Sequence, residues 1–338
     1  MQLQEPETGG KAAGAYVKPY FQTHADVLSP AAQEEPPSLK PTRLKTTDTE
    51  NEGSNSGRRG RWIMLPREHG AWSMVSLPLL AGIALSRGDW LSLNTFAAVL
   101  AVFSVFLFRE PLVFLKRIRR DSARPEARIQ EAVAHRTLIL CLAGMTLSGI
   151  ILLKTLPPLS ILLLGGGALA LVIGSAEIAF QRKQREITAQ ILGVVGLTSS
   201  CLPAYMAVHG SIDQMAFAIW VLSATHSIAA VLIVRARLEA MMAQRRSGTG
   251  TTSRRFYQTA VAWQAGLWSV LLLMAMVGFP WLVIMFLIPS ALHWRDLWRF
   301  HSGCGLDLSL HRTGWRQVGG SLAFYSLVIL LMLGRSLQ

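Results

Sequence analysis

Nine long apolar segments constrain what this 338-residue chain can fold into. Each is close to the roughly 20 residues that a helix needs to cross the hydrocarbon core of a bilayer. Lipid offers the backbone no hydrogen-bond partners, so segments of this length and polarity must be helical. They span residues 69–87, 90–114, 136–154, 157–180, 187–208, 213–236, 257–278, 280–298 and 315–334. We therefore predict an all-α polytopic integral membrane protein with about nine transmembrane helices.

Composition supports the membrane class. Hydrophobic residues make up 51% of the chain and charged residues only 16%, whereas soluble proteins have about one quarter charged. The net charge of +13 would ordinarily suggest nucleic acid. Here the basic residues lie at the ends of apolar segments, as in polytopic membrane proteins. Membrane lipids are thus the expected surroundings, and nucleic acid is not an expected partner.

The distribution of Lys and Arg predicts the orientation. The connections after the second, fourth, sixth and eighth segments are strongly basic, whereas the opposite connections contain only Arg87 and Lys154. By the positive-inside rule, the N-terminus and the basic loops are cytoplasmic and the C-terminus is on the outer side. The eighth segment has the least certain boundaries, because Pro289, His293 and Arg295 shorten its apolar part.

Residues 1–60 differ from the rest of the chain. They are rich in Pro, Glu, Thr, Ser and Gly and contain few large apolar residues. Such a segment buries too little surface to offset its ordering entropy, so we predict a disordered cytoplasmic tail before a membrane domain over 61–338. These residues contain no basic start followed by an apolar stretch, so we do not expect a signal peptide there. Met64 is an alternative position for the start of translation.

The junction between tail and membrane domain contains three ionisable residues, Arg67, Glu68 and His69, directly before Gly70. A local structural explanation is available for two of them, because Arg67 would lie at phosphate level and Glu68 would complement the helix dipole. A titratable Glu–His pair beside a glycine is equally consistent with proton chemistry at a site.

Two further groups of charges occur within apolar segments. Arg109 and Glu110 lie late in the second segment, where ionisable residues usually face the bundle interior or a water-filled cavity, although the two could also neutralise each other. Arg235 and Arg237 close the sixth segment, where arginines also reach out to anionic head groups. His226 precedes them on the same helix and could simply form a hydrogen bond inside the bundle.

No metal or cofactor is predicted. His293 and Asp296 have a spacing that could ligate a metal, but two residues do not make a site. The three cysteines show no C-x-x-C spacing, and the chain contains no recognisable nucleotide-binding or protease motif.

Arg-Glu-His-Gly-Ala-Trp at 67–72 resembles the opening of the YwiC-like family of bacterial integral membrane proteins. Weaker agreement lies in Arg-Glu-Pro at 109–111, in the Glu186 to Pro203 segment and in Val-Arg-x-Arg at 234–237. The resemblance covers about 61–338 and implies a multi-pass protein of the bacterial inner membrane. It implies an architecture more than an activity.

A more distant resemblance in layout is to UbiA-type prenyltransferases, which also have nine helices and long cytoplasmic loops after helices two and six. Their aspartate-rich motifs at the ends of those helices hold Mg²⁺ and a prenyl diphosphate. Here the corresponding ends carry Arg109, Glu110, Lys116, Arg117, Arg235 and Arg237. A lone carboxylate gives little support for a Mg²⁺ site, whereas arginines can neutralise an anionic group directly. A shared scaffold without the shared chemistry is therefore expected.

These observations lead to the hypothesis that the protein has a cytoplasm-facing cavity that binds an anionic, lipid-like ligand. In one version of this hypothesis the protein is a metal-independent relative of membrane prenyltransferases. Its residues are assigned in two groups. Ligand binding is assigned to Arg67, Arg109, Arg235 and Arg237, and any proton chemistry to Glu68, His69 and Glu110. Whether the protein is an enzyme stays open. The alternatives are a transporter or channel lined by Arg109, Glu110 and Glu177, and a membrane subunit of a larger complex.

Overall fold

Ten α-helices account for nearly all of the chain that the computed structural model describes, which is residues 63–66, 69–118, 125–181, 186–246, 255–302 and 310–336. No β-strand occurs among these residues. The predicted tail, residues 1–60, lies outside them. The helices are α1 (His69–Leu85), α2 (Leu93–Ile118), α3 (Pro125–Leu153), α4 (Pro158–Phe180), α5 (Ile187–Thr198), α6 (Cys201–His209), α7 (Gln214–Arg246), α8 (Arg255–Met276), α9 (Trp281–His301) and α10 (Leu310–Ser336).

The helices confirm the predicted class, an all-α polytopic membrane protein. Seven segments of the described chain are long and apolar enough to cross a membrane, with α5 and α6 together forming one of them over Ile187–His209. The apolar helix Gly70–Leu85 is shorter, and α9 is not among the seven. Counting α5 and α6 as one, the predicted nine segments correspond in order to the observed helices.

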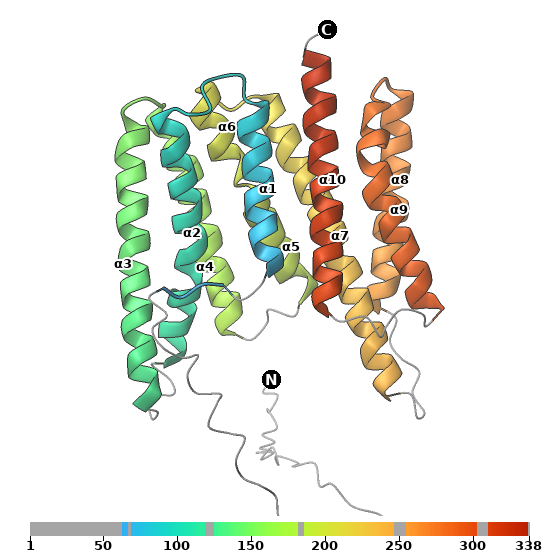
Figure 1. Ribbon diagram of the computed structural model, residues 1–338, viewed down its shortest axis with the longest axis horizontal. Helices are drawn as coiled ribbons and strands as arrows, with labels where there is room; N and C mark the ends of the chain where they lie inside the picture. The colour runs from blue at the N-terminus through green and yellow to red at the C-terminus, as the bar shows by residue number, and fades with distance from the viewer. Residues whose placement is uncertain are drawn as a thin grey trace, which may run out of the picture. The chain divides into compact units, whose positions relative to one another are not determined.

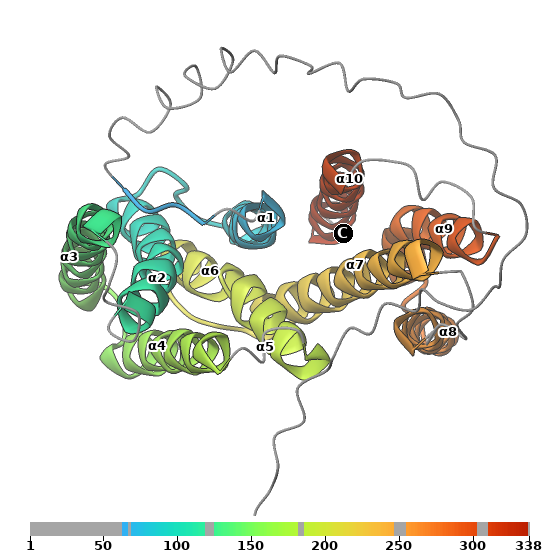
Figure 2. The ribbon, with the colours of Figure 1, turned by 90° about the horizontal axis from the view of Figure 1, so that it is seen from below.

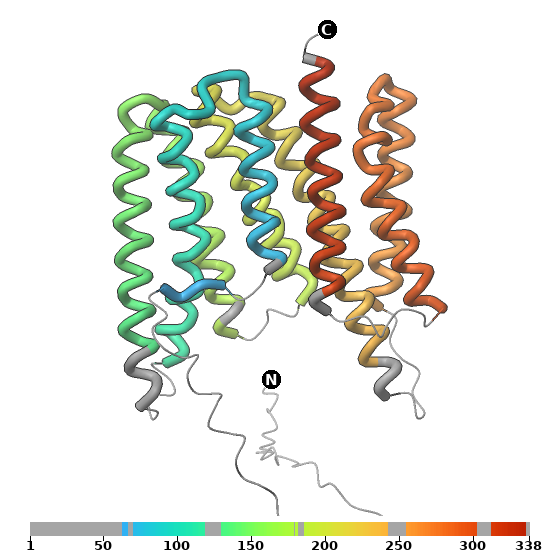
Figure 3. Tube along the Cα trace, viewed as in Figure 1, coloured from blue at the N-terminus to red at the C-terminus, as the bar shows by residue number. Residues whose placement is uncertain are grey.

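The chain crosses back and forth between two ends of the bundle (Figure 1). One end collects the basic residues at the ends of α2, α7 and α9 and at the starts of α8 and α10, and we call it the basic end. It carries Lys116, Arg117, Arg235, Arg255, Arg299 and Arg312. The link from α1 to α2 crosses at the opposite end, as the trace in Figure 3 shows. The charge asymmetry of the sequence is thus a property of the folded bundle.

α1 and α6 approach each other closely beside the break between α5 and α6, which lies four residues before Pro203, because proline lacks the N–H that would bond to the carbonyl of Ser199. The hydroxyl of Ser200, in the break, donates to the backbone carbonyl of Val75 in α1 at 2.8 Å. A Cβ at Gly82 of α1 would lie only 2.5 Å from the carbonyl oxygen of Cys201. Gly82 is therefore required for the backbones to pack at this distance.

α10, the last helix, packs against α1 and α9, and Figure 2 shows it next to α1 at the centre of the view. The largest buried apolar cluster lies where these helices meet α6 and α7. Its members include Ala81, Tyr205, Ile219, Met285, Phe324 and Val328. The core therefore fixes the mutual positions of α7, α9 and α10, the three helices that line the candidate site.

At the end opposite the basic end, Asp213 caps the start of α7. Its Oδ1 accepts from the backbone N–H of Ala216 at 3.0 Å, and its Oδ2 accepts from the hydroxyl of Tyr205 at 2.8 Å. Burial alone would raise the pKa of Asp213, but these donors and the nearby His209 outweigh it and hold the pKa below its ordinary value.

Candidate functional site

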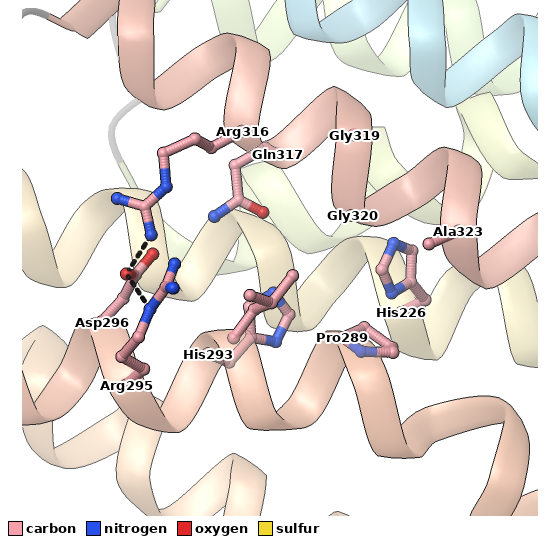
Figure 4. Close-up of a pocket in the computed structure, with 11 residues that line it drawn as sticks. His226, Pro289, His293, Arg295, Asp296, Arg316, Gln317, Gly319, Gly320 and Ala323 are labelled. Atoms are coloured by element: carbon pink, nitrogen blue, oxygen red, sulfur yellow. Dashed lines mark hydrogen bonds and ion pairs between the residues drawn. The ribbon is translucent and has the colours of Figure 1, made fainter.

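A cavity of about 240 Å³ lies between α7, α9 and α10 (Figure 4). Charged residues gather at one end of it, towards the basic end of the bundle, and a histidine lies at the other. We call it the α7/α9/α10 cavity. It is lined by His226, Pro289, Leu292, His293, Arg295, Asp296, Arg316, Gln317, Gly319, Gly320 and Ala323. Gly319 and Gly320 leave this face of α10 without side chains, which helps to keep the space open.

The charged end of the cavity is built around Asp296, a buried carboxylate of α9 that is 5% exposed. Its Oδ1 accepts from Arg316 of α10 at 2.6 Å and lies 3.9 Å from Nε of Arg295. Arg237 of α7 is near enough to interact electrostatically with both Asp296 and Arg316. A buried carboxylate requires such partners, because removing one unpaired charge from water costs roughly several kcal/mol.

The inner end is formed by His226 of α7, which is 2% exposed. Its Nε2 lies 3.0 Å from the hydroxyl of Ser321, and its ring stacks on Phe324 with centroids 4.3 Å apart. These two contacts fix the plane of the imidazole. The other ring nitrogen, Nδ1, is buried and has no hydrogen-bond partner within the part of the chain that the structure describes.

His293 lies between the two ends and is held by a chain of hydrogen bonds from α8. The amide of Gln264 donates to Nδ1 of His293 at 2.9 Å, and Oε1 of Gln264 accepts from the hydroxyl of Ser290 at 2.6 Å. The indole of Trp268 donates to the same hydroxyl at 2.9 Å. These buried polar groups satisfy one another and so hold His293 in a single position.

The predicted residues of the junction, Arg67 and Glu68, lie outside the described residues, as does the side chain of His69. Their predicted roles therefore stay predictions. The start of α1 lies at the basic end of the bundle, in the same half as the last turns of α9 (Figure 1).

Arg109 and Glu110 belong to α2, and the side chain of Arg109 reaches α4. Nε of Arg109 donates to the hydroxyl of Ser175 at 3.2 Å, and its terminal nitrogen pairs with Glu110 at 3.0 Å. Nearer the basic end, Lys116 of α2 pairs with Glu177 of α4. Arg109 and Glu110 are not among the residues that line the α7/α9/α10 cavity, and the contacts described here join α2 to α4.

Arg235 and Arg237 face different neighbours. Nε of Arg235 donates to Gln190 of α5 at 2.9 Å, whereas Arg237 interacts with Asp296 and Arg316. Two residues along a helix correspond to a rotation of about 200°, so the two side chains leave α7 on nearly opposite sides. Of Arg109, Arg235 and Arg237, the predicted ligand-binding arginines within the described residues, Arg237 is the one that interacts with residues of the cavity lining, Asp296 and Arg316.

Several residues of the cavity were not singled out in the sequence. Arg316 was grouped with the basic residues that flank the ninth apolar segment, because it is only the second residue of that segment. In the structure α10 begins at Leu310, so Arg316 is within the helix, on the face towards Asp296. Gln317, Ser321 and Gln264 lie inside apolar segments, and their polarity at that depth was the signal that could have identified them.

Residues 65–206 match the family model described as YwiC-like protein. This region is YwiC-like. The match runs from just before α1 into α6 and confirms the resemblance inferred from Arg-Glu-His-Gly-Ala-Trp. Both Arg109 and Glu110 lie inside the YwiC-like region, whereas the helices that line the α7/α9/α10 cavity follow it.

No curated protein and no solved structure matches the chain. The likeness in layout to UbiA-type prenyltransferases therefore stays a prediction.

Proposed function

We propose that this multi-pass membrane protein binds the anionic group of a lipid-like ligand in the α7/α9/α10 cavity. The observation that carries the proposal is the charge at its outer end, where Arg295, Arg316 and Arg237 surround the single carboxylate of Asp296. Guanidinium groups stay protonated, so this end has a surplus of positive charge in surroundings of low dielectric constant. An anion there would be held by charge-assisted hydrogen bonds.

The position of the cavity favours an amphiphile over a small soluble anion. Its charged end lies towards the basic end of the bundle, at the level where lipid head groups lie, and its walls deeper in the bundle include Pro289, Leu292 and Ala323. A volume of about 240 Å³ accommodates a head group with its nearest carbons. The rest of an apolar chain would lie along the outer surface, where Ile288 and Leu322 are exposed.

The orientation belongs to the same proposal. The basic end carries most of the Lys and Arg residues, so the positive-inside rule assigns it to the cytoplasmic face of a bacterial inner membrane. The cavity would then take its ligand from the cytoplasmic leaflet. Because that leaflet contains anionic lipids, ligand chemistry and membrane position agree.

The proposal can be tested with the purified chain in a non-ionic detergent. Binding of phosphatidylglycerol, phosphatidylcholine and inorganic phosphate would be compared by native mass spectrometry. We expect phosphatidylglycerol to bind, phosphatidylcholine to bind much more weakly, and Arg316→Gln to reduce binding of phosphatidylglycerol by about tenfold or more, the effect of losing a charged hydrogen bond. Preference for free phosphate would identify a soluble anion as the ligand.

Two variants serve as controls. Arg299→Gln removes one exposed positive charge from the same end of α9 without altering the cavity lining, and it should bind phosphatidylglycerol as the wild type does. Arg316→Lys retains the charge and should restore part of the affinity. Equal losses in Arg299→Gln and Arg316→Gln would mean that general surface charge, and no specific cavity, attracts the lipid.

A further inference from the structure

We infer that the ligand carries a second polar group, a hydroxyl or an ester carbonyl, which hydrogen-bonds to Nδ1 of His226 at the inner end of the α7/α9/α10 cavity. This inference rests on the proposed function. It narrows the ligand from any anionic amphiphile to one with a polar linker between its anionic group and its apolar chain, as in a glycerol-based phospholipid.

The first observation is the state of the imidazole. Nδ1 of His226 is a buried polar atom without a hydrogen-bond partner in the described part of the chain, and His226 lines the cavity. Most buried polar atoms in native proteins are satisfied, so an unsatisfied one beside a cavity indicates a group that the cavity receives. The ligand is the natural source of that group.

The second observation is that the imidazole cannot turn to find another partner without losing its own contacts. Nε2 is engaged with Ser321 at 3.0 Å, and the ring lies nearly parallel to Phe324, at 11°. Nδ1 is therefore held in one direction. According to the tautomer it donates or accepts, and a hydroxyl serves in both cases, while an ester carbonyl serves the donating tautomer.

The third observation is the separation of the two recognition points. His226 contacts Ser321 and Phe324, which follow Arg316 by five and eight residues on α10. At 1.5 Å per residue this corresponds to about 8–12 Å along the helix axis. Figure 4 shows the two points at opposite ends of the lining. The Arg316 side chain extends towards Asp296 and away from His226 in Figure 4, so the glycerol linker must be extended for the ligand to reach both points.

A pair of probes isolates the contribution of His226. Lauroyl lysophosphatidic acid and dodecyl phosphate share a phosphate and an apolar chain of the same kind, but only the first has a hydroxyl and an ester. Dissociation constants would be measured for the full chain in detergent. We expect the wild type to bind lauroyl lysophosphatidic acid about three- to tenfold more tightly, the effect of one net hydrogen bond.

In His226→Phe, which keeps an aromatic ring against Phe324, we expect that preference to disappear, so that the ratio of the two dissociation constants falls to about one. Comparing both probes in both proteins cancels their different partitioning into detergent. His135→Phe, an exposed position on α3, is the matched control and should keep the preference. If His226→Phe does not fold, Ser321→Ala tests the same point, because it frees the imidazole to rotate and should weaken the preference.

The outcomes separate the two proposals. A wild type that binds both probes equally, or a His226→Phe variant that keeps the full preference, overturns the inference about His226. In that case an Arg316→Gln variant with weakened binding of both probes would leave the proposed function standing. If Arg316→Gln binds both probes as the wild type does, the proposed function itself fails.

Discussion

Arg316 of α10 and Asp296 of α9 bring a guanidinium nitrogen and a carboxylate oxygen within 2.6 Å. The side chain of Asp296 is only 7% exposed and that of Arg316 is 30% exposed. The pair therefore joins the last two helices in a setting where water screens it little. It also fixes one wall of the α7/α9/α10 cavity, so the stability of the bundle and the proposed ligand binding would depend on the same contact.

Asp296→Asn should lower stability by about 3 kcal/mol, because it leaves Arg316 and Arg237 close together without the carboxylate between them. The measurement is thermal unfolding of the purified protein in detergent. Combining Asp296→Asn with Arg316→Gln should recover part of the loss, since the double variant removes the uncompensated charge as well. A single variant as stable as the wild type would contradict this account of the pair.

Gly82→Ala should destabilise the bundle by about 1–3 kcal/mol, because the added Cβ would lie 2.5 Å from the carbonyl oxygen of Cys201 and push α1 away from α6. Gly174→Ala in α4 is the matched control, since nothing lies within 4 Å of a Cβ there. Unfolding temperatures of the two variants compared with the wild type provide the test. Equal unfolding temperatures would show that α1 and α6 can separate without cost.

Asp213 should make stability depend on pH in the acid range. Its pKa is lower in the folded state than in the unfolded chain, so its contribution is complete above the unfolded pKa and is lost as pH falls through the folded one. The unfolding temperature should therefore fall below about pH 4, and Asp213→Asn should flatten that decline.

Arg109→Gln distinguishes the cavity from the site first hypothesised from the sequence. Arg109 contacts Ser175 and Glu110 and does not line the α7/α9/α10 cavity, so the variant should lose at most about 1 kcal/mol of stability and keep its affinity for phosphatidylglycerol. Native mass spectrometry in parallel with Arg316→Gln decides the point. Loss of the lipid from Arg109→Gln would favour a site shared between Arg109 and the junction residues.

The proposed orientation can be checked with reporter fusions in a bacterial host. Alkaline phosphatase, which is active only outside the cytoplasm, should be active when fused after α10 and inactive when inserted in the connection between α7 and α8. The reverse pattern would place the basic end outside and would remove the argument that the cavity opens to the cytoplasmic leaflet.

The sequence predicted the helices well because length and apolarity alone decide whether a segment can cross a bilayer. It also placed the basic residues at one end of the bundle. The break at Ser199 and Ser200 was not predicted, although Pro203 indicates it, because a proline lacks the N–H that would bond to the carbonyl four residues earlier, that of Ser199.

The candidate site was harder to predict, because its contacts join residues far apart in the chain. His226 hydrogen-bonds to Ser321 and stacks on Phe324, and both residues are almost 100 positions later in the chain (roughly 95 or more). Contacts of this kind depend on how the helices of a bundle pack, which the sequence does not specify. Arg235 and Arg237 were assigned one role because they are close in sequence. Helical periodicity already indicates that side chains two positions apart diverge, and the structure assigns them to different neighbours.

The packing of α10 against α1 and α9 has a consequence for biosynthesis. The ribosome makes α10 after every other described helix, so the membrane must hold α1 and α9 with one side uncovered until α10 inserts. During that interval the carboxylate of Asp296 has yet to meet Arg316. A chain interrupted before α10 would therefore leave Asp296 with Arg295 and Arg237 as its remaining cationic neighbours, and one face of α1 and of α9 uncovered.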